Sequence, residues 1–187
     1  MQLKTFERTS GIKSELTQIR RAGNIPAVIY AKGELAQHVV VDGAQFRALL
    51  RDVKKGCLSI TKISLEGNNG IKEAVLKEIQ YNPTTYDVSH LDFESLDPSR
   101  YINVKVPIQY VGIADCVGIK SGGGTLRQVI RSMRISCLPK HIPGEPLQID
   151  IRELQVGQTK RLSDIVMPDG IKPLADLNEV AVVIAKG

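Results

Sequence analysis

Residues 20–30 read RRAGNIPAVIY, and this stretch is the most informative part of the chain for its fold. Two arginines end a short amphipathic segment, a Gly and a Pro interrupt the chain, and an apolar run leads to Tyr30. We therefore predict a helix that stops at Gly23, followed by a strand over 27–30. Such a scaffold holds guanidinium groups beside a phenol, and phosphates and base edges are natural ligands for that mixture. Arginines at a helix C-terminus also interact favourably with the helix dipole, so the stretch alone leaves a purely structural explanation open.

The rest of the first half predicts a mainly β structure with two helices. Ser14 is placed to cap the first helix, over 15–21, in which Leu16 and Ile19 share one face. Alternating apolar and polar residues predict the strands, and Asn and Gly residues at 66–70 predict the loop of a hairpin. The predicted strands cover residues 2–8, 27–30, 37–41, 57–65, 71–79 and 88–93.

The second helix is predicted to follow Asp42, which is placed as its N-cap. Apolar residues then recur at i, i+3, i+4 and i+7, which is helical spacing; they are Phe46, Leu49, Leu50 and Val53. We expect Lys54 and Lys55 in the last turn, with Gly56 as the stop. The basic side of this helix fits either a solvated surface or a contact with an RNA backbone.

A boundary between two domains is predicted at 96–100, where the sequence LDPSR precedes a change in composition. Two of the nine prolines precede this point and seven follow it. The second half is predicted to be almost wholly β, with strands at 101–111, 133–138, 147–151, 171–173 and 180–185. The chain is therefore predicted to form two mostly β domains, 1–95 and 96–187, of which the first also contains the helices.

The sequence SGGGT at 121–125 is the obvious glycine-rich segment. A phosphate-binding P-loop ends in Gly-Lys-Ser/Thr before a helix, because the Lys reaches the phosphates. Here Gly124 and Thr125 are followed by Leu126 and Arg127, and no such Lys is present. We therefore expect a flexible turn rather than a nucleotide site.

The distribution of charge favours a polyanionic partner for the first third of the chain. The formal net charge is +5, and residues 1–55, with ten Lys and Arg but five Asp and Glu, carry a balance of +5. Residues 56–95 carry −3 and residues 96–187 carry +3. A basic end of this kind suits nucleic acid, although a charge of this size is also common on protein surfaces.

The cysteines and the apolar runs indicate the class of protein. Cys57, Cys116 and Cys137 are widely spaced, without a Cys-x-x-Cys motif or a neighbouring His. This spacing argues against a disulfide framework or a zinc site and suits a reducing cytosol, so we expect no metal and no other cofactor. There is no signal-peptide pattern and no apolar run long enough to span a bilayer, and we expect a cytoplasmic protein with no membrane contact.

His90 and Asp92 form the only other candidate site. In a strand, residues two apart project from the same face, so the two side chains are expected to lie together. They could form an acid–base couple, but no nucleophile motif accompanies them. The two alternatives are a hydrogen bond between the side chains that stabilises the strand edge and a contact of both side chains with RNA base edges and 2′-hydroxyls.

Several segments are similar to motifs of one known family. Residues 19–30, IRRAGNIPAVIY, resemble the leading motif of the bacterial large-subunit ribosomal protein twenty-five family, and residues 89–93, SHLDF, resemble its second motif. In the second half, VKVPIQYVG at 104–112, LPKHIP at 138–143 and LSDIVMPDGI at 162–171 are similar to the family's long form, known as general stress protein CTC. The motifs keep their order over essentially the whole chain.

This resemblance implies a small N-terminal β-barrel, with helices, that binds 5S ribosomal RNA, followed by a mostly β C-terminal domain. It implies that Arg20 and Arg21 contact phosphate and that Tyr30 contacts a sugar or a base. His90 and Asp92 would contact base edges or 2′-hydroxyls. The side chains of this surface would thus divide the work between positioning the RNA and selecting it.

The family's upstream basic residues are matched only in part. This chain has GIK at 11–13, so Lys13 is expected to replace them partly in RNA contact. The resemblance implies a non-catalytic structural constituent of the large ribosomal subunit, monomeric within the ribosome and touching other components of that subunit. The alternative is a protein-interaction or stress-regulatory adaptor that acts through residues 96–187.

Overall fold

In this computed structural model the described residues are 1–8, 13–31, 33, 35–54, 56–67 and 70–186, and the side chain of Lys13 lies outside them. The chain forms two compact units, Met1–Arg100 and Tyr101–Gly187, and each is described by itself. Strands provide most of the regular structure in both units, so the prediction of a mainly β protein with a few helices is confirmed.

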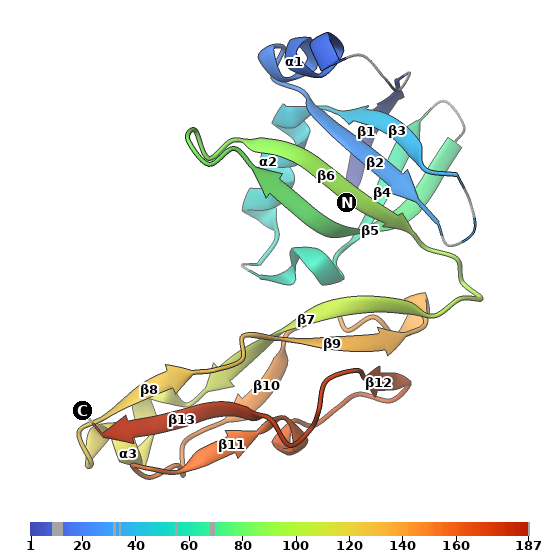
Figure 1. Ribbon diagram of the computed structural model, residues 1–187. Helices are drawn as coiled ribbons and strands as arrows, with labels where there is room; N and C mark the ends of the chain where they lie inside the picture. Colours follow the sequence, from blue (N-terminus) through green and yellow to red (C-terminus); the bar gives the residue numbers. More distant parts are fainter. Residues whose placement is uncertain (9–12, 32, 34, 55, 68–69, 187) are drawn as a thin grey trace. The chain divides into compact units, whose positions relative to one another are not determined.

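The strands of the first unit close into a barrel, as the family resemblance implied (Figure 1). They are β1 (Gln2–Glu7), β2 (Ile25–Tyr30), β3 (Gln37–Val41), β4 (Lys62–Gly67), β5 (Gly70–Tyr81) and β6 (Val88–Ser95). Around the barrel the order is β1-β3-β2-β6-β5-β4. β1 pairs with β4, and β2 with β6, in parallel, while the other neighbours are antiparallel. Closure removes free strand edges, which would otherwise pair with other chains.

Alternating apolar side chains fill this barrel. Ile25, Ala27 and Ile29 of β2 are buried, as are Leu91 and Phe93 of β6. Burial of each large side chain contributes roughly 1.5–3 kcal/mol to the stability of the folded state. Because the side chains of a strand alternate in direction, Val28 and Tyr30 of β2 and Asp92 of β6 face outward.

The first helix, α1 (Lys13–Arg21), ends just before Gly23, as predicted. The φ of Gly23 is 81°, in the left-handed region that glycine adopts without penalty. Its N–H donates to the carbonyl of Arg20 at 3.0 Å, and this contact closes the last turn. The helix begins at Lys13, so Ser14 lies within it, and the predicted cap at Ser14 is wrong.

The second helix, α2 (Gly43–Asp52), begins at the predicted cap. Oδ1 of Asp42 accepts hydrogen bonds from the backbone N–H of Ala44 at 2.7 Å and of Gln45 at 3.3 Å. The helix ends earlier than predicted, because Val53 is extended and packs against the barrel core. Lys54 therefore lies beyond the last turn, and Lys55 lies outside the described residues.

Residues 57–60 form a 3₁₀ turn, η1 (Cys57–Ile60), rather than the start of the predicted strand. Cys57 and Ile60 are both buried, and a spacing of three residues places both on one side of a turn but not of a strand. The hydroxyl of Thr61 donates to the carbonyl of Cys57 at 2.8 Å and closes this turn. The hairpin that follows pairs Gly67 with Gly70, so its loop is shorter than the predicted 66–70, and residues 68–69 lie outside the described ones.

The second unit contains two sheets. Its strands are β7 (Ile102–Val111), β8 (Gly124–Gln128), β9 (Ser132–Cys137), β10 (Leu147–Asp150), β11 (Thr159–Arg161), β12 (Ile171–Pro173) and β13 (Val180–Lys186). One sheet has the order β10-β7-β9-β12 and the other has the order β11-β13-β8. The hydroxyl of Tyr110, on β7, donates to the carbonyl of Ala181, on β13, at 2.9 Å and joins the two sheets. The sequence predicted five of these strands but missed β8 and β11.

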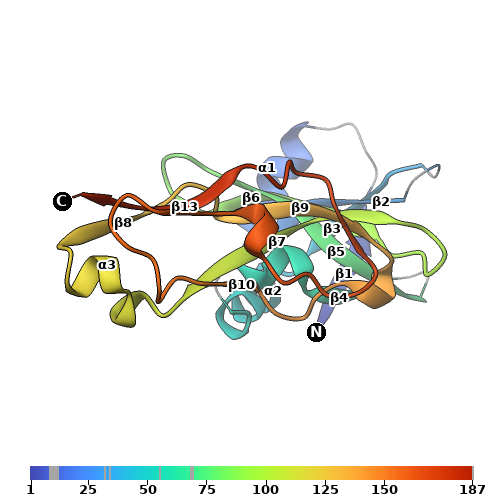
Figure 2. The ribbon, with the colours of Figure 1, turned by 90° about the horizontal axis from the view of Figure 1, so that it is seen from below.

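The glycine-rich segment 121–125 forms a turn at Ser121 and Gly122, as predicted, but its last two residues, Gly124 and Thr125, belong to β8. Gly124 is buried at the start of β8, and a Cβ placed on it would lie 2.6 Å from Cγ2 of Ile184 and 2.9 Å from the carbonyl oxygen of Gly118. Gly118 belongs to a short helix, α3 (Val117–Lys120), that lies beside β8 near the C-terminus (Figure 1 and Figure 2). Glycine is therefore required here for close packing of α3, β8 and β13.

Candidate nucleic-acid interface

The outer surface of the barrel brings together the two segments that the sequence singled out for RNA contact. β2 and β6 are parallel neighbours, with Val28 opposite Asp92 and Tyr30 opposite Glu94. Since the apolar residues of both strands alternate into the core, Tyr30, His90 and Asp92 face outward. Three of the predicted RNA-contacting residues, from segments far apart in the sequence, thus share one face.

His90 and Asp92 interact directly on this face. Nδ1 of His90 donates to Oδ1 of Asp92 at 2.7 Å, with 21% and 30% of the two side chains exposed. The pair lies on the outer surface of the barrel, and neither residue lines the cavities described below. Within the described residues, no group of three or more His, Cys, Asp and Glu side chains is arranged to hold a metal ion. The open position of the pair on the barrel surface argues against the acid–base interpretation, which requires a pocket around the reacting groups.

Tyr30 lies half-buried beside this pair. Burial raises the pKa of its phenol above the ordinary value, and the negative charges of Glu94, Asp92 and Glu78 raise this pKa further. The phenol therefore keeps its proton at neutral pH and is available as a hydrogen-bond donor. A donor and several acceptors are thus concentrated on one small surface.

Two acidic residues that the sequence analysis did not single out complete this surface. Glu94 lies opposite Tyr30, and Glu78, on β5, lies opposite Asp92. Lys77 forms an ion pair with Glu94 beside an irregularity in the β5–β6 pairing. The strand period could have pointed from Asp92 to Glu94, but Glu78 could be found only from the register of β5 and β6. We call the outward side chains of Tyr30, Glu78, His90, Asp92 and Glu94 the acidic face.

The acidic face suits base edges better than phosphates. Carboxylates repel phosphate oxygens, but they accept hydrogen bonds from the amino and imino groups of bases. In proteins that bind nucleic acids, contacts with base edges select the partner, whereas contacts with phosphates fix the position of the partner. The acidic face therefore needs cations on its flanks if it is to approach RNA.

One such flank is provided by the C-terminal end of α1. Nε of Arg20 donates to the carbonyl of Ser89 at 3.1 Å, so α1 is tied to the residue that precedes His90. Arg21 is exposed in the same last turn. Arg20 thus has a structural contact as well as its predicted role in phosphate binding, and the side chain of Lys13 lies outside the described residues.

A second cationic flank lies at β3. Arg8, which follows β1, has its Nη2 3.3 Å from Nδ1 of His38, and its backbone N–H donates to the carbonyl of His38 at 3.0 Å. His38 is opposite Val28 in the pairing of β2 and β3, so it faces outward on the strand next to β2. The sequence analysis missed both residues, because nothing in their separate segments shows that β1 and β3 are neighbours.

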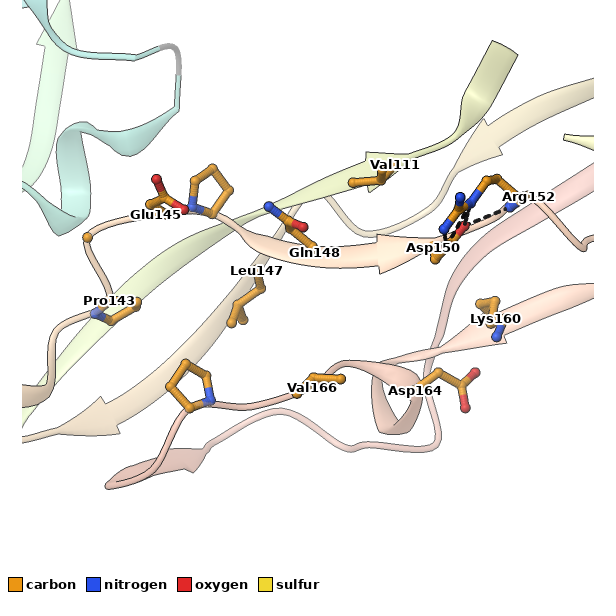
Figure 3. A pocket seen from close by; sticks show the side chains of 13 residues that line it. Val111, Pro143, Glu145, Leu147, Gln148, Asp150, Arg152, Lys160, Asp164 and Val166 are labelled. Atoms are coloured by element: carbon orange, nitrogen blue, oxygen red, sulfur yellow. Dashed lines mark hydrogen bonds and ion pairs between the residues drawn. The ribbon is translucent and has the colours of Figure 1, made fainter. Parts of the chain in front are cut away.

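A cavity of about 680 Å³ lies in the second unit (Figure 3). β10, with Leu147 and Gln148, runs along one side of it, and the segment that carries Asp164 and Val166 runs along the other. At one end Nε of Arg152 donates to Oδ2 of Asp150 at 2.9 Å. This contact lowers the pKa of the Asp150 carboxyl to about 2, so both charges are already compensated by a near neighbour.

None of the helices found in the described residues has the length and apolar character needed to cross a membrane.

Two family models match the chain. The model described as Ribosomal L25p family matches residues 3–93, and the model described as Ribosomal protein TL5, C-terminal domain, matches residues 101–187. The two matches fall on the two structural units in turn.

Several curated proteins are similar to the chain over its full length. The Large ribosomal subunit protein bL25 of Chlamydia pneumoniae is 42% identical over 186 residues, with 100% of both chains covered. The proteins of the same name from Chlamydia abortus and Chlamydia muridarum are each 44% identical over 186 residues, again with 100% of both chains covered.

Proposed function

This chain belongs to the ribosomal L25p family in its two-domain form, and we propose that its first unit binds 5S ribosomal RNA. As a member of this family it is a structural, non-enzymatic protein of the large ribosomal subunit, located with the ribosome in the cytoplasm. The proposal adds to this role the identity of the RNA and the surface that meets it.

One observation carries the proposal. The parallel pairing of β2 and β6 brings Tyr30 next to the strand that carries His90 and Asp92. These are the outward residues for which the family resemblance implied RNA contact. Nothing in the core of the barrel requires polar groups at these outward positions, so their assembly on one face supports a role in recognition.

The arrangement of charge supports two separate roles on this surface, phosphate binding by the arginines and base recognition by the acidic face. Arg20 and Arg21, at the end of α1, would hold phosphates beside the start of β6. The acidic face would then accept hydrogen bonds from base amino groups, and Tyr30 would donate one. A wide, shallow groove is required for such contacts, because the deep groove of A-form RNA does not admit side chains.

The proposal is tested by titrating the full chain with 5S ribosomal RNA and with an unrelated structured RNA of equal length. We expect preferential binding of 5S ribosomal RNA, with an affinity that falls steeply as salt increases, since phosphate contacts release counterions. Equal affinity for the two RNAs, or binding that is insensitive to salt, would contradict the proposal.

We further propose that the second unit contacts other components of the large ribosomal subunit and that the protein acts as a monomer. The support is the match of the TL5 C-terminal model to residues 101–187. Co-sedimentation of the full chain with large subunits after a moderate salt wash tests this. Release of the protein under conditions in which its 5S ribosomal RNA complex survives would favour the adaptor alternative.

A further inference from the structure

A groove of about 470 Å³ lies beside Arg20, separate from the acidic face. Three elements form it: the end of α1 with the turn that follows, one side of α2, and the loop between β5 and β6. Its lining combines apolar, aromatic and cationic residues, among them Ile25, Leu50, Arg20, Arg47, Tyr81 and Tyr86.

Tyr86 is the unusual residue of this groove. Its φ is 58°, which makes it the one non-glycine residue of the described chain with a left-handed backbone, and 80% of it is exposed. Its N–H donates to the carbonyl of Asn82 at 2.8 Å, and the N–H of Asn82 donates to the carbonyl of Asp87 at the same distance. The loop thus imposes an unfavourable conformation on a large aromatic side chain that buries little surface. Such strain concentrates at functional sites.

The groove also favours an anion. Arg20 and Arg47 line it, whereas Asp87 is the one carboxylate among the residues that do. The bond from Nε of Arg20 to the carbonyl of Ser89 fixes the position of this guanidinium group at the groove wall. Arg47 is exposed on α2, and its guanidinium group lies near the turn at Gly23. Gly43 lies between them: a Cβ built on it would be 2.0 Å from the carbonyl oxygen of Gly23 and 3.3 Å from Nη1 of Arg47.

An exposed aromatic ring, an apolar floor and two guanidinium groups match the parts of one nucleotide. Bases without a pairing partner are recognised by stacking on aromatic rings, and arginines hold the attached phosphates. We propose that this groove binds one unpaired nucleotide of the RNA, with the base stacked on Tyr86 and the phosphate held by Arg20 and Arg47. This inference rests on the proposed function and adds a subsite to it.

The position of the groove supports RNA rather than an acidic peptide as the occupant. Ser89 lines the groove and directly precedes His90 of the acidic face. Arg20 contacts Ser89 and also lines the groove, so one guanidinium group lies at the junction of the two surfaces. An RNA strand that crosses the acidic face can therefore continue into the groove without a break in its contacts.

The absence of Trp from the sequence provides a direct test. Tyr86→Trp places the sole indole of the full chain in the groove, and a stacked base quenches indole fluorescence. We expect strong quenching on addition of 5S ribosomal RNA and weak quenching with a fully paired RNA hairpin of similar length. Tyr101→Trp, in the second unit, controls for quenching that does not depend on the groove. Normal 5S ribosomal RNA affinity without quenching at position 86 would overturn the subsite and leave the proposed function intact.

Affinity measurements on three further variants of Tyr86 separate stacking from folding. Tyr86→Ala is expected to weaken 5S ribosomal RNA binding by roughly ten-fold, whereas Tyr86→Phe, which keeps the ring, stays near the wild-type value. Tyr86→Gly relieves the left-handed strain, so we expect unchanged or higher thermal stability together with the same loss of affinity. Arg47→Ala should likewise weaken 5S ribosomal RNA binding, because it removes one of the two arginines proposed to hold the phosphate, and Arg51→Ala, on α2 but outside the groove lining, is its matched control.

Two further outcomes would overturn the inference. If all Tyr86 variants bind 5S ribosomal RNA normally but are retained less well on large subunits, the groove binds a protein and the inference is wrong. If the wild-type chain itself fails to bind 5S ribosomal RNA, the proposed function fails together with the subsite.

Discussion

The acidic face of the first unit and the cavity of the second unit are both rich in charge, but their charges are organised differently. In the second unit, Asp150 interacts with Arg152, two residues away, and Asp115 interacts with Lys120. At the flanks of the acidic face, Arg20 contacts Ser89 and Arg8 contacts His38, across separations of 69 and 30 residues. Pairs of near neighbours, such as Asp150 with Arg152 or His90 with Asp92, can form on any solvated surface. Contacts between distant segments instead assemble a defined arrangement that a partner can recognise.

Because distant segments assemble the acidic face, we expect this face to require the intact core of the barrel. Phe93 is fully buried between Asp92 and Glu94, so Phe93→Ala should lower the free energy of unfolding of the first unit by about 3–5 kcal/mol. Denaturant unfolding measures the loss, and Phe6→Ala, at an exposed position of β1, is the control with little expected effect. A loss below about 1 kcal/mol for Phe93→Ala would show that the face does not depend on this core.

The second expected effect concerns selectivity. Asp92→Ala should reduce the preference for 5S ribosomal RNA over an unrelated RNA by about 1–3 kcal/mol, because base-edge contacts carry discrimination. Competition binding with the two RNAs measures it. Asp150→Ala, in the second unit, should leave the preference unchanged, because this carboxylate is not part of the acidic face. Equal effects of the two substitutions would remove the distinction between the two regions.

A smaller effect is expected from the flanking arginines. Arg21→Ala should weaken all RNAs nearly alike and lower the slope of log affinity against log salt by about 1, as loss of one phosphate contact does. Arg20→Ala should cost more, because it also removes the contact with Ser89. The comparison is measured by binding at several salt concentrations. Unequal effects of Arg21→Ala on different RNAs would instead make this arginine a selecting residue.

The smallest effect concerns the local pair of the second unit. Arg152 lowers the pKa of Asp150 from 3.8 to about 2, so the contribution of this pair to stability is present above about pH 4 and is lost as the pH falls towards 2. Asp150→Asn should therefore lower stability slightly above about pH 4, neutral pH included, make no difference near pH 2, and so flatten the acid dependence between these values. Thermal unfolding between pH 2 and pH 7 measures this. Because the pair is fully exposed, solvent screening keeps the effect small.

The elements of the fold that could be predicted from the sequence depend on near neighbours in the chain. Asp42 was recognised as a cap because its acceptor and the free N–H groups lie within three residues. The stop at Gly23 and the strands β2, β3, β6 and β13 followed from turn chemistry and alternation in the same way. The prediction that a strand begins at Cys57 was wrong, because a short apolar run such as Cys57–Ile60 fits a turn as well as a strand until its neighbours in space are known. β8 was missed because its one glycine, Gly124, packs closely against Ile184 and Gly118, whereas the sequence shows it only as part of a glycine-rich run.

In the candidate site, too, some features follow from the local sequence and others only from contacts between distant segments. The sequence alone singled out Arg20, Tyr30, His90 and Asp92, through their residue types and a family resemblance, and the period of two placed His90 and Asp92 on one face. It determined which side of each strand is polar, because that period is a local property of the backbone. Only the tertiary structure decided that Tyr30 lies opposite Glu94, that Glu78 joins the acidic face, and that Tyr86 and Arg47 share a groove with Arg20. Strand register and barrel closure depend on pairing between distant segments, and local patterns carry no information about which segments meet.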